Sequence, residues 1–299
     1  MTTVARLRAF VAVADAGSVR AAARRLVVTE SAVSAAVASL AREVGVPMIE
    51  REGRGLRLTA SGRTYAGYAR TILGLHDEAL AAARGGTDPE HGRVRVAAVT
   101  TAGDHVLPAL LAGFLARHPG VDLRLDVGTS ERVWDLLAAR QADLVIAGRP
   151  PPGLRGATVR AVRPNTLVAV AAPAVASGFD PARTRWLLRE PGSGTRAACE
   201  ALLVSWETEP PRLTLGSNGA VVAAAVAGLG VTLISREAVT RQLADGELVV
   251  VKAPGTPLRR PWHAVTASPE QASTMLLIGH LLRAGEAGRW RAAPASPPR

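Results

Sequence analysis

The stretch from Ser18 to Leu40, SVRAAARRLVVTESAVSAAVASL, places the strongest constraint on what this chain can fold into. Ser18 and Thr29 are good helix N-caps, and each precedes a short helical pattern of small apolar residues. The β-branched pair Val27 and Val28 interrupts the first pattern just before Thr29. The stretch therefore predicts two short helices joined by a tight turn.

The second of these helices has two different faces. Val33, Val37 and Leu40 recur at helical spacing and form the apolar face that packs inward. The opposite face carries small or polar residues, namely Glu30, Ser31, Ser34, Ala35 and Ala38. A short exposed helix of small residues, held by a helix packed across it, fits a DNA major groove. An ordinary helical hairpin inside a core remains the alternative for this stretch taken alone.

A basic hairpin follows these helices. Residues 48–59, MIEREGRGLRLT, predict two short extended pieces around a Gly-containing turn at 52–55. Arg51, Arg54 and Arg57 lie three residues apart around this turn. A hairpin with arginine at its tip is typical of the wing of a winged helix, which lies on phosphate or enters the adjacent minor groove. A solvated hairpin whose arginines only add solubility is the alternative.

A long helix is predicted from Ser61 to about residue 84. The residues of its main stripe follow three- and four-residue steps: Tyr65, Ala69, Ile72, His76, Ala79, Leu80 and Ala83. A lone helix must bury such a stripe, and the commonest partner is its copy in a second subunit. Residues 85–92 then form a polar, Gly/Pro-rich linker, which marks a domain boundary.

The length of 299 residues and a hydrophobic content of 48% leave room for two domains with ordinary cores. The formal charge of +11 is typical of polyanion-binding proteins, but most of the basic excess lies beyond residue 92 and does not locate a DNA-binding face. Cys199 is the only cysteine, which excludes an intrachain disulfide. The N-terminus does not resemble a signal peptide, and no apolar run reaches the roughly 18 residues of a membrane span. We expect a cytoplasmic protein without a membrane partner.

The rest of the chain alternates strand and helix patterns. Three apolar strands with two helices between them predict a parallel βαβ sheet. The strands are expected at 94–99, 121–127 and 142–147, and the helices at 105–117 and 130–140. The Pro/Arg-rich segment 149–164 is expected to cross to a second subdomain.

The same alternation repeats in the second subdomain. Its strands are expected at 166–171, 186–188, 213–215 and 231–234, and its helices at 195–206 and 218–227. Residues 248–251 and 261–267 are expected to return as strands toward the first subdomain, before a last helix at 275–283. The tail 284–299 is rich in Ala, Pro and Arg and is expected to be disordered.

Three polar stretches are candidates for a ligand site: the first follows a predicted strand, and the other two open predicted helices. They are Thr100–Thr101, the turn PGSGTR at 191–196, and GSN at 216–218, with Thr129 as a fourth candidate. Ligands of open α/β sheets bind outside the carboxyl ends of the strands, where helix N-termini favour anions. These stretches therefore predict a ligand site. Ordinary helix caps and turns remain the alternative.

Residues 3–84 resemble the N-terminal half of a LysR-type transcriptional regulator. The matching signature is LRAFVAVADAGSVRAAARRLVVTESAVSAAVASLAREVGVPMIEREGRGLRLTASG. It includes Phe10 in the first helix, Gly17-Ser18 before the second, the A-A-x-x-L and S-A-V-S patterns of the two central helices, and the R-x-x-R-x-x-x-L-T-x-x-G wing.

The resemblance implies an α/β protein with three parts. An all-α winged helix-turn-helix (1–60) precedes a dimerising linker helix and hinge (61–92), and an effector-binding domain follows (93–283). That domain is expected to hold two α/β Rossmann-like subdomains of the periplasmic-binding-protein type. Residues 93–163 and about 260–283 would form subdomain I, and residues 164–259 subdomain II.

The resemblance also implies a function. The chain would be a sequence-specific DNA-binding regulator, not an enzyme, whose promoter binding responds to a small anionic effector of unknown identity. The EPGSGTR stretch resembles the branch that includes regulators of carbon-dioxide fixation and cysteine synthesis. Expected partners are double-stranded DNA, the effector, further copies of the chain in a homodimer and homotetramer, and RNA polymerase. No metal or other cofactor is expected.

The expected site residues form two groups. DNA contacts are expected from Ser18, Thr29, Glu30, Ser31, Ser34, Arg51, Arg54 and Arg57. Effector contacts are expected from Thr100, Thr101, Thr129, Ser193, Gly194, Thr195, Arg196, Ser217 and Asn218.

The sequence departs from the family pattern at both ends. Glu30 stands where relatives often carry Gln, and Ala35-Ala36 replace polar residues. Glu30 can accept from cytosine N4 but repels phosphates; as a first-turn acid it also favours the helix dipole. Gly219 and Val222 stand where the branch tends to place Glu and Lys, so two charges that could fix a ligand are absent.

Three other functions deserve comparison with this one. An enzyme could use Ser193, Thr195 or Cys199 as nucleophile, but none lies in a nucleophile elbow, and Gly-Ser-Gly-Thr lacks the Lys of a catalytic phosphate loop. A redox switch at Cys199 would need an external thiol partner or a second subunit. The third is a constitutive regulator whose effector cleft is vestigial.

Overall fold

The computed structural model describes residues 1–53, 55–83, 88–154, 156–268, 270–283 and 290–294. The chain divides into two compact units, one comprising residues 1–86 and 138–141 and the other the remaining residues. Arg54, at the tip of the predicted wing, lies outside the described residues.

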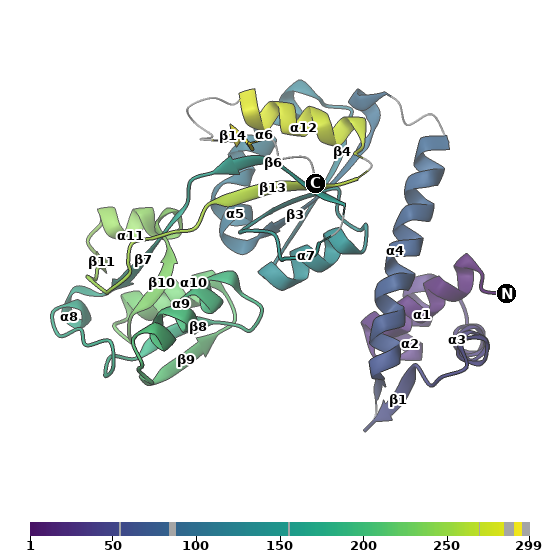
Figure 1. The fold of residues 1–299 in the computed structure, drawn as a ribbon, viewed down its shortest axis with the longest axis horizontal. Coiled ribbons are helices and arrows are strands. Elements are labelled where there is room, and N and C mark those ends of the chain that lie inside the picture. Colours follow the sequence, from purple (N-terminus) through teal and green to yellow (C-terminus); the bar gives the residue numbers. More distant parts are fainter. Residues whose placement is uncertain (54, 84–87, 155, 269, 284–289, 295–299) are drawn as a thin grey trace. The chain divides into compact units, whose positions relative to one another are not determined.

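The first unit is a winged helix-turn-helix followed by a long helix (Figure 1). Its elements are α1 (Val4–Ala16), α2 (Val19–Leu26), α3 (Glu30–Val44), β1 (Ile49–Glu52), β2 (Gly55–Leu58) and α4 (Ala60–Ala83). The Ser18 hydroxyl accepts from the Ala21 amide at 3.4 Å and the Thr29 hydroxyl from the Ala32 amide at 3.2 Å. Both predicted N-caps are thereby confirmed, and β1 pairs antiparallel with β2 as the wing pattern predicts.

The core of this unit explains why α3 presents only one face to solvent. Val33 and Leu40 are buried against α1 and α2, and Phe10 meets the ring of Tyr65 edge-on at 5.6 Å. The opposite face of α3 was predicted to point outward. Its residues are all exposed, namely Glu30, Ser31, Ser34, Ala35 and Ala38.

Val27 ends α2 in a conformation that suits it poorly. Its φ of 57° is left-handed, and its side chain is 88% exposed, so no packing offsets the strain. We expect Val27→Asn to raise the free energy of unfolding by about 1 kcal/mol, because Asn tolerates this region. Urea unfolding measures the change. Val28→Asn is the matched control, since Val28 is also exposed but lacks a positive φ; an equal gain there would contradict the explanation.

The apolar stripe of α4 differs from the prediction. Tyr65 and Ala69, expected in an intersubunit seam, pack instead within the first unit against α1. Ile72, Ala79 and Leu80 of the predicted stripe are exposed, as expected for a seam. Tyr68 and Leu75 are exposed as well, and Tyr68, Ile72, Leu75 and Ala79 form a heptad-like stripe with steps of four, three and four residues. The physical reason is that the first turns of α4 also complete the winged-helix core.

The second unit contains a six-stranded sheet in the order β14-β6-β13-β5-β3-β4. Its strands are β3 (Arg93–Val99), β4 (Asp122–Gly128), β5 (Leu144–Ala147), β6 (Ala157–Arg163), β13 (Trp262–Ala267) and β14 (Arg291–Ala292). The strand β3 runs parallel to β4 and β5, which confirms the predicted βαβ sheet, and β13 runs antiparallel between β5 and β6.

Helices cover both faces of this sheet (Figure 1). One face packs on α6 and α12, and the other packs on α7. The helical elements of this subdomain are η1 (Pro89–His91), α5 (Thr100–His105), α6 (Leu107–Arg117), α7 (Ser130–Ala138) and α12 (Ala272–Arg283).

A second subdomain is built on β7 (Thr166–Ala171). Its other strands are β8 (Trp186–Arg189), β9 (Arg212–Leu215), β10 (Thr232–Ser235), β11 (Val249–Val250) and β12 (Leu258–Arg259). The helical elements are α8 (Pro173–Ala176), α9 (Gly194–Ser205), α10 (Asn218–Val226), η2 (Arg236–Val239) and α11 (Thr240–Ala244). The core that contains α9 lies on one face of β7 and the core that contains α10 lies on the other.

The chain crosses between the subdomains twice, at residues 164–165 and again at 260–261. The two crossings are hydrogen-bonded to each other. The Arg260 amide donates to the Asn165 carbonyl, and the Asn165 side-chain amide donates to the Arg260 carbonyl, both at 2.9 Å. They form the connection between the two subdomains.

The predicted helix at 105–117 is confirmed as α6, and the separate short helix α5 before it was not predicted. Three expectations about this unit are wrong. Residues 157–163, expected within a crossing segment, form β6 of the first sheet, and β11, expected to return to that sheet, pairs with β7. Residues 290–292 of the tail are ordered: β14 pairs with β6, and Trp290 is buried in the first core. The burial of one large indole overcomes the polar composition around it.

Among the described residues, no helix is long and apolar enough to cross a membrane.

Candidate functional site

Two parallel strands of the first sheet end side by side and begin the site. The register pairs Val99 with Gly128, so the residues that follow these strands lie next to each other. Thr100 opens α5, and its hydroxyl donates to the Gly128 carbonyl at 3.3 Å. Thr129 precedes α7, and its hydroxyl accepts from the Arg132 amide at 3.4 Å.

The second subdomain contributes the turn that follows β8. Gly192 adopts a φ of 80°, which a side chain would strain, and thereby turns the chain into α9. Ser193 is the N-cap residue of α9, and its hydroxyl lies 3.0 Å from that of Thr195. This turn thus presents two hydroxyls and the start of a helix toward the first subdomain.

Between the subdomains lies a cavity of about 50 Å³, here called the cleft cavity. It is lined by six predicted residues, Thr100, Thr101, Thr129, Ser193, Gly194 and Thr195. The sequence reasoning missed the other lining residues, which include Asn165, Arg189, Ser235, Arg260 and Trp262.

The other three predicted residues lie outside the cavity wall. The Ser217 hydroxyl accepts from the Ala220 amide at 3.1 Å and caps α10. Asn218 is buried, and its side chain forms hydrogen bonds with Arg189 and Thr101. Arg196 lines a wider groove of about 670 Å³, the outer groove, which shares Ser193, Gly194 and Arg260 with the cleft cavity. The guanidinium of Arg196 is held by Glu200 at 2.8 Å.

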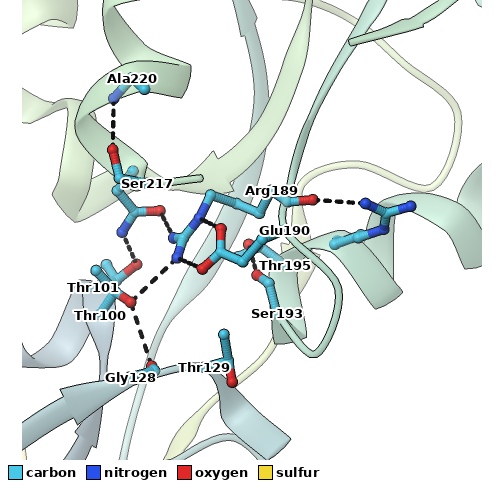
Figure 2. Close-up of polar contacts among 12 residues, drawn as sticks. Thr100, Thr101, Gly128, Thr129, Arg189, Glu190, Ser193, Thr195, Ser217 and Ala220 are labelled. Atoms are coloured by element: carbon cyan, nitrogen blue, oxygen red, sulfur yellow. Dashed lines mark hydrogen bonds and ion pairs between the residues drawn. The ribbon is translucent and has the colours of Figure 1, made fainter. Parts of the chain in front are cut away.

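Arg189 is the centre of the polar network in the cleft (Figure 2). Its buried guanidinium donates to the Glu190 carboxylate at 2.6 and 2.7 Å, to the Asn218 carbonyl oxygen, and to the Thr100 hydroxyl at 3.2 Å. The Asn218 amide donates to the Thr101 hydroxyl at 2.9 Å. Because both threonines belong to the first subdomain, two of these bonds join the subdomains across the cleft.

The network also sets the charge state of Glu190. Hydrogen bonds from Arg189 hold the pKa of this carboxyl below its usual value, although partial burial opposes the shift. Arg189 and Glu190 therefore neutralise each other at neutral pH.

Arg260 differs from Arg189 in having no such counter-charge. Its guanidinium is half-buried and donates to the Gly194 carbonyl, and burial lowers its pKa. Within the described ranges, no carboxylate lies within 4.0 Å of it. An arginine remains charged even after such a shift. Counting the described residues alone, the wall of the cleft cavity therefore carries one uncompensated positive charge.

Two residues of α10 at which the sequence departs from the family pattern lie outside the cleft cavity. Gly219 and Val222 line a separate groove with Asp104 and His105. The cleft cavity includes neither of them. Their lack of charge therefore has no direct effect on the cavity wall, contrary to the sequence-based expectation.

The candidate DNA surface combines α3 and the wing. Glu30, Ser31 and Ser34 are exposed on the outward face of α3, and the Glu30 carboxylate lies 3.9 Å from the Arg20 guanidinium. Arg51 is exposed on β1. Arg57 is also exposed, but it forms ion pairs with Glu50 and Glu52 at 2.7 and 3.4 Å. The hydroxyl oxygens of Ser18 and Thr29 accept the capping hydrogen bonds of α2 and α3.

Cys199 is buried in α9, and burial raises the pKa of its thiol to about 12. Since the thiolate is the reactive form, we expect the folded chain to resist oxidation and alkylation at neutral pH. Mass spectrometry after iodoacetamide treatment should find Cys199 unmodified in the native protein and alkylated in guanidinium. Labelling of Cys199 in the native chain at the rate of a free thiol would contradict the expected protection. It would then favour the redox-switch hypothesis for Cys199.

In the part of the chain that the structure describes, no cluster of three or more His, Cys, Asp or Glu side chains could hold a metal ion.

Comparison with known proteins agrees with this architecture. Residues 4–63 match the family "Bacterial regulatory helix-turn-helix protein, lysR family", and residues 87–284 match "LysR substrate binding domain". The chain is 37% identical over 278 residues to the HTH-type transcriptional regulator CfxR of Cupriavidus necator, covering 91% of this chain and 87% of that one. It is 35% identical over 271 residues to the regulator CbbR of Rhodospirillum rubrum, covering 87% and 88%.

Solved structures show the same fold. Full-length OxyR C199D from Pseudomonas aeruginosa aligns with a TM-score of 0.67 at 19% identity, covering 99% of both chains. The regulatory domain of Synechocystis CcmR, solved in complex with 2-PG, aligns with a TM-score of 0.56 at 27% identity, covering 63% of this chain and 96% of that one. Two relatives, at 35% and 33% identity, are RuBisCO operon transcriptional regulators. The chain belongs to the LysR family of DNA-binding transcriptional regulators, whose DNA binding responds to effectors.

Proposed function

We propose that this regulator senses a small anionic metabolite in the cleft cavity. The observation that carries the proposal is Arg260, a half-buried cation in the cavity wall without a carboxylate partner among the described residues. A buried charge is costly unless it is paired, so an anionic ligand would complete the site.

The size of the cleft cavity supports a compact anionic group. A volume of about 50 Å³ holds a few water molecules, and thus suits a group of carboxylate or phosphate size. The hydroxyls of Ser193 and Thr195 lie beside it as hydrogen-bond partners. The outer groove, which shares Arg260 and Ser193, offers room for the remainder of the molecule.

The relatives support a phosphorylated or carboxylated effector and a target in carbon fixation. CcmR was solved with 2-PG, and other relatives are described as RuBisCO operon transcriptional regulators, at 35% identity for the one from Acidithiobacillus ferrooxidans. We propose that this chain controls genes of the same kind in response to a metabolite of this class.

A thermal-shift screen of the full-length chain tests the effector proposal. Phosphate esters including 2-PG, small carboxylates and neutral sugars would be compared at constant ionic strength. A ligand that binds the folded state raises the melting temperature by mass action. We expect a saturable increase with one anionic class, reduced in Arg260→Gln and retained in the control Arg259→Gln, since Arg259 is an exposed neighbour outside the cavity. No increase with any anion would favour the constitutive regulator.

We further propose that α3 enters the DNA major groove and that the wing contacts the neighbouring backbone. The exposed stripe Tyr68, Ile72, Leu75 and Ala79 would pair two chains through α4 and present two half-sites. Assembly of dimers into tetramers and contact with RNA polymerase are extensions of this proposal. A regulator of this kind acts where the chromosome is, so we propose a cytoplasmic location.

Glu30 is the most informative position on the proposed DNA surface. It is exposed at the start of α3, where its negative charge repels phosphate. We expect Glu30→Gln to strengthen binding and to change base preference at one position per half-site. Selection from random duplexes followed by sequencing measures both effects. Unchanged affinity and unchanged preference would show that Glu30 does not contact DNA.

A further inference from the structure

A second cavity lies at the first crossing between the subdomains. It has a volume of about 490 Å³ and is here called the hinge cavity. Its wall includes His105, Arg163, Asn165, Thr166, Arg236 and Glu237. Because Asn165 belongs to the first crossing, this cavity borders the segment that must move if the subdomains change their relative orientation.

The charges around the hinge cavity favour an anion. Arg163, at the end of β6, forms an ion pair of 2.6 Å with Glu237 of η2. Arg236 also lines the cavity and is exposed, and no carboxylate within the described segments lies within 4.0 Å of its guanidinium. Two arginines and one glutamate in the lining give it a net positive charge. Thr166 adds a hydroxyl to the wall.

The hinge cavity is physically connected to the cleft cavity. Asn165 lines both of them. The Arg163 guanidinium lies 5.2 Å from the ring centroid of Trp262, and Trp262 lines the cleft cavity. Furthermore, the Arg163–Glu237 ion pair joins the first sheet to the second subdomain, because β6 and η2 belong to different subdomains. A ligand that changes this pair acts on the connection between the subdomains.

We propose that the hinge cavity is a second anion site, separate from the cleft cavity, for a metabolite that bears a phosphate or carboxylate group. The anion lies between Arg236 and Arg163 and competes with Glu237 for the Arg163 guanidinium. Binding weakens the inter-subdomain ion pair and thereby changes the orientation that the cleft cavity presents to its own ligand. The chain thus receives two signals on one domain.

Hydrogen–deuterium exchange of the full-length chain with inorganic phosphate tests this proposal. Phosphate is titrated against chloride at constant ionic strength, and exchange is followed separately in two regions. Segments 158–168 and 233–242 report on the hinge cavity, and segments 99–103 and 190–196 report on the cleft cavity. Since the two regions have separate readouts, a failure of one site is distinguishable from a failure of the other.

We expect saturable slowing of exchange in the hinge segments. In Arg236→Gln the midpoint of that titration should rise by about tenfold or more, as for loss of a charge-assisted hydrogen bond. Arg241→Gln is the matched control, since it removes the same charge nearby without touching the hinge cavity wall. Absence of saturable slowing at the hinge in the unaltered chain would overturn the proposal, and so would an equal shift in both variants.

Discussion

Gly62→Ala is expected to lower the free energy of unfolding of the winged-helix unit by about 3 kcal/mol. Gly62 lies in the first turn of α4, and a Cβ atom there would lie 1.8 Å from the Met48 carbonyl oxygen. The obstructing atom belongs to the backbone before β1, so it cannot rotate away as a flexible side chain could. Relief requires a shift of α4 or of the wing. Urea unfolding monitored by circular dichroism measures the loss.

Gly67→Ala provides the matched control in the same helix. Apart from its chain neighbours and the backbone of α4, no atom of the described residues lies within 4 Å of the Cβ position at Gly67. Because alanine favours helix, this variant should be more stable by about 1 kcal/mol. Opposite signs for the two substitutions would identify the close approach at Met48 as the cause. Similar stability of Gly62→Ala and the unaltered chain would contradict the packing described for α4.

Arg189→Met is expected to lower the free energy of unfolding of the second unit by about 3 kcal/mol. The substitution fills similar volume but leaves the Glu190 carboxylate and the Asn218 carbonyl oxygen without their donor. Glu190 is partly exposed, and water therefore recovers some of its solvation. Thermal and urea unfolding of the full-length chain measure the loss.

The pH dependence of this effect has a definite sign. Arg189 lowers the pKa of Glu190 from 4.5, so the stabilisation is fully present above that value and is lost as pH falls through the lower, folded pKa. The difference between Arg189→Met and the unaltered chain should accordingly shrink in strong acid. Adding Glu190→Gln to Arg189→Met should recover part of the loss at neutral pH. The exposed Arg183→Met is the control, and a loss there of similar size would refute the assignment.

The helix-turn-helix could be predicted because its determinants are local. Ser18 and Thr29 cap helices within three residues of themselves, and Val33 and Leu40 reveal their face by spacing alone. The seam of α4 could not be predicted in the same way. Whether Ala69 faces α1 or a second subunit depends on tertiary packing, which one helical stripe does not specify.

The candidate site shows the same limit more clearly. Thr100 and Ser193 follow strands and open helices, so their positions at the sheet edge follow from the chain order. Arg260 has no such local signal. The return of the chain to the first sheet after residue 259 was predicted, but no sequence pattern indicates that the Arg260 side chain faces the cavity. Sequence patterns thus located the hydroxyl groups that follow strands β3, β4 and β8 and missed Arg260.

The bonds from Arg189 to Thr100 and from Asn218 to Thr101 have a thermodynamic consequence for any effector. These bonds hold the two subdomains together across the cleft. A molecule too large for the remaining space must therefore bind to the less populated open conformers, in which the bonds are broken. The measured dissociation constant then exceeds the intrinsic one by the reciprocal of the open fraction. Substitutions that remove these hydrogen bonds can therefore lower the measured dissociation constant instead of raising it. The effector concentration to which the protein responds therefore depends on the open fraction of the unliganded protein as much as on the contacts that the ligand makes.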